Sequence, residues 1–280
     1  MEMRGIMGGF YKISEWIMRL SVTNILWVIC SSPFFFLLLS MLISPGVSED
    51  GGVTSDIVKQ WLLTLAIVAP FTLVPASAAM FSVVRKWVMG EEDVPLFKTF
   101  FRGYKQNYLQ SMLGGLIFLA IAVILYINFL FYTSQSDTMK LLSYLFIMLF
   151  VLLVGAFLNF LSITVHFHMK LFQIVKNAFL LTIGNPIGTI VTLVCSGFIM
   201  YISSKYTFLI PFFMGSLIAF VAFWQFYRNF QRIQDKMEKL AQKEQEGKEG
   251  KGKGKESEKI EPLALDDAAN RSSEDGQANK

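Results

Sequence analysis

Six long stretches of the sequence contain no Lys, Arg, Asp or Glu, and this constrains the fold more than any other feature. They cover residues 20–41, 60–84, 106–136, 141–169, 177–204 and 206–227. A helix needs about 20 apolar residues to cross a hydrocarbon core that is roughly 30 Å thick. A soluble domain of 280 residues could not bury 27 Phe in a chain that is 54% hydrophobic. The sequence therefore predicts an all-α fold, a polytopic membrane helix bundle with about six transmembrane helices.

The same stretches set the expected boundaries along the chain. Predicted spans lie at about residues 22–43, 60–84, 109–132, 142–164, 187–204 and 208–227. An interfacial helix is expected over residues 1–21, the membrane domain over 22–230, and a helical extension over 231–245. Residues 246–280 are rich in Gly, Lys, Glu and Ser and poor in large apolar side chains, so we expect disorder there.

Lys and Arg in the connecting segments indicate the orientation, because short cytoplasmic loops of membrane proteins carry an excess of positive charge. Residues 1–20, 85–108 and 165–186 hold ten of them, whereas the alternate side holds only Lys59, Lys140 and Lys205. The tail from Arg228 adds twelve to the first side. The sequence therefore predicts that both termini are cytoplasmic and that the protein is a multi-pass component of the cell membrane.

The predicted cytoplasmic segment 85–108 begins with three anchoring residues. Arg85 and Lys86 would lie among the lipid headgroups, and the indole of Trp87 would lie at the interfacial belt. An amphipathic helix is expected to follow, with Asp93 as its N-cap and Pro95 in its first turn.

This helix carries an aromatic face with the spacing i, i+3, i+4, i+7 and i+11. The face consists of Phe97, Phe100, Phe101, Tyr104 and Tyr108. Lys98, Arg102 and Gln106 lie opposite, and Lys105 adds a charge near the end. A helix of this kind lies flat on the inner leaflet or docks on a partner protein. We therefore predict a membrane-anchoring or partner-docking surface here that includes Phe97, Phe100, Phe101, Tyr104 and Lys105.

Polar and helix-breaking residues gather in the first two predicted spans. They form a candidate intramembrane polar site, which consists of Asn24, Ser31, Pro33, Pro70, Pro75 and Ser77. Prolines free backbone carbonyls, and broken helices build many transport sites. The favoured interpretation is instead that prolines and small residues, as in 75–79, shape helix packing.

No catalytic residue, cofactor or metal site is predicted. His166 and His168 are the only histidines, and at i, i+2 on a helix they point apart. Cys30 and Cys195 fall inside predicted spans, where cysteine usually packs as a small apolar residue. The sequence contains neither a phosphate-binding glycine loop nor a nucleophile elbow. We therefore expect a non-enzymatic protein that binds no nucleic acid.

Three motifs resemble the YesL-like family of bacterial membrane proteins. They are NILWVICSSP (24–33), PASAAMFSVVRKWVMGEE (75–92) and FKTFFRGYKQNY (97–108), and GFYKISEWIMRL (9–20) also fits. The resemblance implies a polytopic protein of the bacterial cell membrane, often encoded beside carbohydrate-uptake systems.

Together, the resemblance and the patterned cytoplasmic side predict an accessory factor for carbohydrate uptake. Its expected partners are the lipid bilayer and an oligosaccharide ABC importer or another membrane protein. Two alternatives stay open. One is a small-solute transporter or facilitator with its site near the broken first and second spans. The other is a sensor or scaffold that signals through the C-terminal helix and tail.

Overall fold

The computed structural model describes residues 6–43, 55–91, 93–135 and 137–260. All regular elements in these residues are helices, which confirms the all-α class. The chain divides into two compact units, Met1–Asn229 and Phe230–Lys280, called unit 1 and unit 2 below. Within the described residues, unit 2 consists of the continuation of the last helix.

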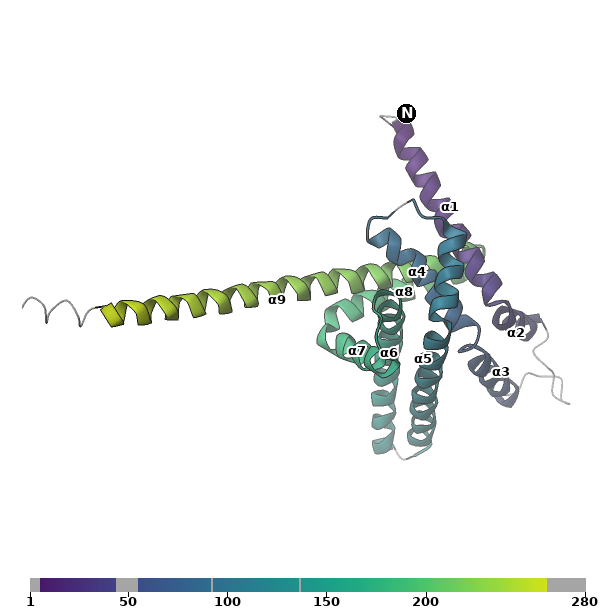
Figure 1. Cartoon of the computed structure of the whole chain (residues 1–280). Coiled ribbons are helices and arrows are strands. Elements are labelled where there is room, and N and C mark those ends of the chain that lie inside the picture. Colours follow the sequence, from purple (N-terminus) through teal and green to yellow (C-terminus); the bar gives the residue numbers. More distant parts are fainter. Residues whose placement is uncertain (1–5, 44–54, 92, 136, 261–280) are drawn as a thin grey trace, which may run out of the picture. The chain divides into compact units, whose positions relative to one another are not determined.

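Figure 1 shows the path of the helices. In chain order they are α1 (Ile6–Cys30), α2 (Ser32–Ile43), α3 (Ser55–Val68), α4 (Leu73–Val88), α5 (Leu96–Thr133), α6 (Asp137–His166), α7 (Leu171–Gly184), α8 (Pro186–Lys205), the π-helix η1 (Ile210–Met214) and α9 (Gly215–Ile260). The long helices α5 and α6 lie side by side and run in opposite directions.

Among the described residues, five helices are long and apolar enough to cross a membrane, and a bent pair makes a sixth. The pair consists of α3 and α4, which meet at 51°. Pro70 lies in the break between them. A proline lacks the N–H that continues a helix and clashes with the preceding turn, so the chain bends here. The prediction of about six transmembrane helices is confirmed.

The start of the membrane region differs from the sequence prediction. Instead of an interfacial helix over 1–21 and a span over 22–43, α1 runs unbroken from Ile6 to Cys30. The break comes at Ser31, just before Pro33 enters the first turn of α2. Proline is well tolerated at this place and not further along a helix, which explains the position of the break. The charge of Arg19 suggests an earlier boundary, but its side chain is buried in the fold.

The aromatic and basic segment after the α4–α5 loop is not a separate helix. It forms the first turns of α5, which continues for 38 residues. At 1.5 Å per residue such a helix is about 57 Å long, nearly twice the roughly 30 Å hydrocarbon core. One end of α5 must therefore extend beyond the hydrocarbon, and its charged residues all lie in the first ten positions.

Helix α4 lies at the centre of unit 1 and packs closely on α5. Ala76, Ala78 and Ala79 are fully buried, as is Phe160 on α6. A Cβ atom added at Gly103 on α5 would lie 2.6 Å from the side chain of Ser82 on α4, so the two helices touch where they cross. The small residues of α4 serve helix packing, which is the interpretation that the sequence favours.

The C-terminal helix is longer than predicted. The sequence predicts disorder from residue 246, but α9 continues to Ile260. Lys and Glu, which dominate this segment, are good helix formers in isolation, whereas its glycines are not. The rest of the predicted tail, 261–280, lies outside the described residues.

Candidate functional site

A polar groove opens where α4 ends, α5 begins and α6 ends. Its volume is about 590 Å³, which is within the usual range for small-molecule sites. The groove is lined by Ser82, Arg85 and Lys86 of α4, by Thr99, Arg102, Gly103, Gln106, Asn107 and Gln110 of α5, and by Thr164, Val165, Phe167 and His168 at the end of α6. Ten of these thirteen side chains are polar or charged, in a protein whose membrane helices are almost wholly apolar.

Local sequence explains how α4 and α5 come to face each other here. Gly90 has a φ of 92°, which an L side chain rarely adopts, and it ends α4. The backbone N–H of Gly90 donates to the carbonyl of Trp87, and the N–H of Glu91 donates to that of Lys86. The chain then turns back, and α5 starts after Pro95. Gly103 lets α5 approach α4 closely beside the groove.

The groove has a positive electrostatic character. Arg85, Lys86 and Arg102 line it, and the described lining contains no carboxylate. Lys86 is partly neutralised by Glu91, whose carboxylate oxygen lies 2.9 Å from its Nζ. Arg85 uses Nη1 to donate to the carbonyl of Val165 at 2.6 Å, which ties α4 to the end of α6. The remaining N–H groups of the two arginines give the groove several positively charged donors.

Two amides complete the wall on α5. The Nδ2 of Asn107 donates to Ser82 Oγ and to the Gly103 carbonyl, and the Nε2 of Gln110 donates to the Met169 carbonyl at 2.7 Å. These bonds use both N–H groups of Asn107 and one of the two of Gln110, and they fix both side chains. The amide oxygens are then left as acceptors for hydroxyl groups.

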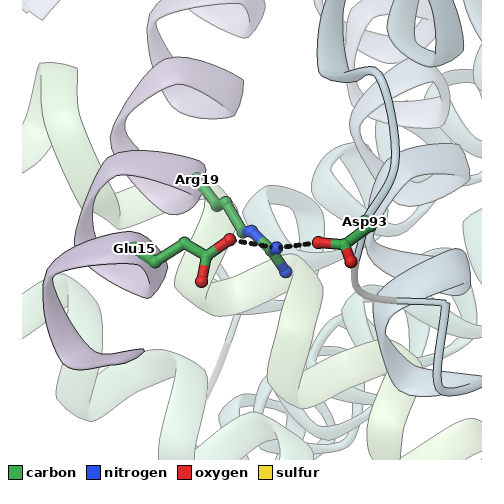
Figure 2. Close-up of polar contacts among 3 residues, drawn as sticks. All are labelled: Glu15, Arg19 and Asp93. Atoms are coloured by element: carbon green, nitrogen blue, oxygen red, sulfur yellow. Dashed lines mark hydrogen bonds and ion pairs between the residues drawn. The ribbon is translucent and has the colours of Figure 1, made fainter. Parts of the chain in front are cut away.

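Two acidic side chains of the α4–α5 loop, Glu91 and Asp93, pair with basic side chains of the fold. Figure 2 shows the guanidinium of Arg19, on α1, between the carboxylates of Glu15 and Asp93. Its distance to Asp93 Oδ1 is 2.9 Å, and the Arg19 side chain is only 7% exposed. Asp93 therefore tethers the α4–α5 loop to α1. The prediction that Asp93 caps α5 is wrong, because the N-cap is Pro95 and no side chain caps that end.

The structure changes the role of two predicted docking residues. Trp87 is 4% exposed and packs edge-on against Trp16 with ring centroids 5.7 Å apart, so it cannot lie at a lipid interface. Phe100 is fully buried in the core. The prediction for Phe100 is wrong because aromatic periodicity shows which residues share a face of one helix, but not what covers that face. The prediction for Trp87 is wrong because a position at the end of an apolar stretch does not show what packs on the side chain.

Other members of the predicted docking surface are accessible. Phe97 is 61% exposed and Phe101 is 51% exposed. Lys105 is exposed, whereas Tyr104 and Tyr108 are half-buried and pack on each other with ring centroids 5.5 Å apart. The accessible aromatic surface therefore consists of Phe97 and Phe101.

The candidate intramembrane polar residues are mostly occupied with helix packing. The Nδ2 of Asn24 donates to the Ile210 carbonyl at 2.9 Å, and its Oδ1 accepts from the backbone N–H of Ser216 at 2.9 Å. Asn24 thus bonds the backbone of the first residue of the π-helix η1, which contains Pro211, and that of a residue just after its end. A Cβ at Gly215 would lie 2.9 Å from Asn24 Oδ1, so glycine is needed for this contact.

The remaining members of that set form a second link. Trp27 Nε1 donates to Ser77 Oγ at 3.0 Å, and the hydroxyl of Ser77 donates to the Leu73 carbonyl. The hydroxyl of Ser31 donates to the carbonyl of Trp27. Pro70 and Pro75 are buried, and Pro33 is exposed. The structure therefore brings Asn24, Ser31 and Ser77 into contacts between helices or within them, and their hydrogen-bonding groups are already in use.

Sequence reasoning did not single out most of the groove. Thr99, Arg102, Gln106 and Gln110 recur on α5 at spacings of three and four, opposite the aromatic face, and this polar stripe is visible in the sequence. Ser82 and His168 carry no such signal, since only tertiary packing brings them to α5. Among the described residues, no group of three His, Cys, Asp or Glu side chains could hold a metal ion.

Comparisons with known proteins fit this architecture. Residues 20–129 match the family described as "Protein of unknown function, DUF624". "Uncharacterized protein YesV" of Bacillus subtilis (strain 168) is 31% identical over 155 residues, which cover 55% of this chain and 74% of YesV. The chain belongs to the DUF624 family. The resemblance to YesL-like proteins is thereby confirmed.

Two other DUF624 relatives of Bacillus subtilis (strain 168) match over more of the chain. "Uncharacterized protein YteU" is 29% identical over 220 residues, which cover 79% of this chain and 84% of YteU. "Uncharacterized protein YesL" is 26% identical over 217 residues, which cover 77% of this chain and 87% of YesL. No solved structure matches significantly. The DUF624 match includes the groove residues on α4 and α5. The groove residues at the end of α6 lie beyond residue 129, where the match ends.

Proposed function

We propose that this DUF624 protein is a non-enzymatic accessory factor of the bacterial cell membrane that docks on a membrane subunit of an oligosaccharide ABC importer. The observation that carries the proposal is the pair of accessible aromatic side chains, Phe97 and Phe101, in the first turns of α5. The description of the DUF624 family and the names of the relatives specify no reaction.

The length of α5 supports a docking role for these two residues. Lys98, Arg102 and Lys105 lie in the same turns and could not enter hydrocarbon without a large cost. The first turns of α5 are therefore expected to extend beyond the hydrocarbon, on the side that we expect to be cytoplasmic. Exposed phenylalanines outside the hydrocarbon gain stability when they pack against a partner protein or the headgroup region.

The assignment to carbohydrate uptake rests on the family resemblance. YesL-like proteins are often encoded beside carbohydrate-uptake systems, so the membrane subunits of such an importer are the first partners to test. The docking surface itself is chemically suited to any apolar patch near the membrane surface, because two phenylalanines flanked by basic residues favour an apolar partner with an acidic rim.

A second candidate is a small-solute transporter or facilitator. The helix breaks at Ser31, at Pro70 and at η1 favour it, because broken membrane helices often build transport sites. The bonds of Asn24 and Ser77 weigh against it, since a solute would have to replace contacts that hold the helices together. Uptake of a sugar panel by purified protein in liposomes tests this candidate.

The docking proposal is tested with a double variant, Phe97→Ala with Phe101→Ala. The matched control is Phe36→Ala with Phe198→Ala, which removes two phenylalanines of α2 and α8 that are at least as exposed as Phe97 and Phe101. Crosslinked, tagged protein is purified from native membranes, and importer subunits are quantified by mass spectrometry. We expect the docking variant to recover at least tenfold less importer subunit than the unmodified protein. The control variant should recover as much as the unmodified protein. Equal recovery in both variants would overturn the proposal.

A further inference from the structure

We propose that the groove between α4, α5 and α6 binds a phosphorylated polyol. The chemistry is that of a phosphate group next to hydroxyls, which is found both in the glycerol phosphate headgroup of an anionic lipid and in a soluble sugar phosphate. This inference does not depend on the docking of Phe97 and Phe101, which do not line the groove.

The phosphate would lie between the two arginines. Arg85 comes from the last turn of α4 and Arg102 from the second turn of α5, so the charges approach the groove from different walls. Guanidinium groups bind phosphate through paired N–H donors, and Lys86 adds a further positive charge at the edge. Among the described residues no carboxylate lies within ion-pair distance of either arginine. The positive charge of the groove is therefore available to an anion.

The hydroxyls would lie along the amide wall. Both N–H groups of Asn107 and one N–H of Gln110 donate to protein oxygens, as described above, and this fixes the rotamers of both side chains. Their amide oxygens accept hydrogen bonds and cannot donate them. A polyol supplies hydroxyl donors for these amide oxygens. Gln106 is exposed at the mouth and adds one more amide.

A comparison with another cavity shows that the polarity is specific to this place. A hollow of about 220 Å³ lies between α5 and α6 further along the same helices. It is lined by apolar and aromatic side chains only: Leu125, Tyr126, Phe129, Phe146, Ile147, Phe150 and Val151. That surface is suited to lipid chains. The groove at the other end of the same helix pair is polar, so its lining does not serve to contact lipid chains.

Binding is tested with the full chain purified in detergent and with glucose 6-phosphate as the soluble probe. Glucose serves as the control ligand without phosphate, and isothermal titration calorimetry gives the dissociation constants. The lipid arm uses nanodiscs that contain equal amounts of phosphatidylglycerol and phosphatidylcholine. Native mass spectrometry then counts the lipids that remain bound after extraction.

The decisive variant is Arg102→Gln, and its matched control is Lys105→Gln, which removes the same charge from α5 outside the groove. Arg102 is exposed, so the fold should survive, and the melting temperature of each variant checks this. Loss of one charge-assisted contact should weaken binding about tenfold. The control variant should bind like the unmodified chain.

The outcomes separate the two sources of the ligand. Selective binding of glucose 6-phosphate over glucose, weakened in Arg102→Gln alone, supports a soluble sugar phosphate. Selective retention of phosphatidylglycerol, lost in Arg102→Gln alone, supports a lipid headgroup. Binding of neither probe, or equal loss in Arg102→Gln and Lys105→Gln, would overturn the proposal, because a general surface charge would then explain the result.

Discussion

Replacement of Asn24 by alanine should destabilise the protein more than almost any other single polar substitution. This side chain is fully buried on α1 and holds two backbone groups, one at the start of the π-helix η1 and one just after its end. One is the carbonyl of Ile210, and the other is the N–H of Ser216, each at 2.9 Å. Alanine supplies neither a donor nor an acceptor, so both backbone groups lose this partner.

The expected magnitude follows from those two bonds. An unsatisfied buried polar group costs about 1–3 kcal/mol, so the loss of two partners predicts a decrease of about 2–6 kcal/mol in the free energy of unfolding. For a protein with 150–250 ordered residues, each kcal/mol shifts the melting temperature by about 2–4 °C. Asn24→Ala should therefore lower the melting temperature by at least about 4 °C.

The assay is thermal unfolding of the purified protein in one detergent at a fixed scan rate, followed by intrinsic tryptophan fluorescence. The matched control is Asn128→Ala, because Asn128 is a half-buried asparagine on α5 whose described hydrogen bond goes to a carbonyl of its own helix, that of Ile124. The control should shift the melting temperature by less than 2 °C. If Asn24→Ala melted within 1 °C of the unmodified protein, this would refute the claim that the two hydrogen bonds of Asn24 stabilise the backbone at η1.

Three other predictions concern residues of unit 1. Gly103→Ala should destabilise the protein by about 1–3 kcal/mol through overpacking, whereas Gly197→Ala, whose Cβ would meet nothing within 4 Å, should be neutral or stabilising by up to about 1 kcal/mol in the same melting assay. Arg19→Gln should lower the melting temperature more than Asp93→Asn, because the buried guanidinium binds two carboxylates and Asp93 is one exposed partner; an equal or reversed order would contradict the tether. A single cysteine replacing Lys98, in a chain without its native cysteines, should react with a membrane-impermeant maleimide only after the cells are permeabilised, and labelling of intact cells would refute the predicted orientation.

Apolar patterning and proline positions predict most of the helical architecture. Charge-free stretches locate the helices because hydrocarbon excludes charge, and Pro70 and Pro211 locate breaks because proline cannot continue a helix. These are local properties of the chain, so the sequence displays them directly. The small residues of α4 likewise predict close packing, and the crossing at Gly103 confirms it.

The pairing of charges is not a local property, and the sequence prediction fails there. Arg19 looks like the boundary of a membrane span, but a carboxylate 74 residues later in the chain helps to hold it inside the fold. Asp93 likewise looks like a helix cap, because the sequence shows only that it precedes the start of a helix. The sequence does not show that its carboxylate pairs with Arg19. The groove also depends on distant residues, because the bond from Arg85 to the Val165 carbonyl spans 80 residues. Periodicity reveals one wall of the groove, and the packing of three helices supplies the rest.

The most direct test of the functional account is site-specific photocrosslinking at position 97, with position 198 on α8 as the control. Each variant carries a photoreactive amino acid in place of one exposed phenylalanine and is irradiated in native membranes. We predict that position 97 crosslinks to a membrane subunit of a carbohydrate ABC importer and that position 198 crosslinks only to lipid. Crosslinking of position 97 to lipid alone, with the importer present, would contradict the proposal that this surface docks on a partner protein.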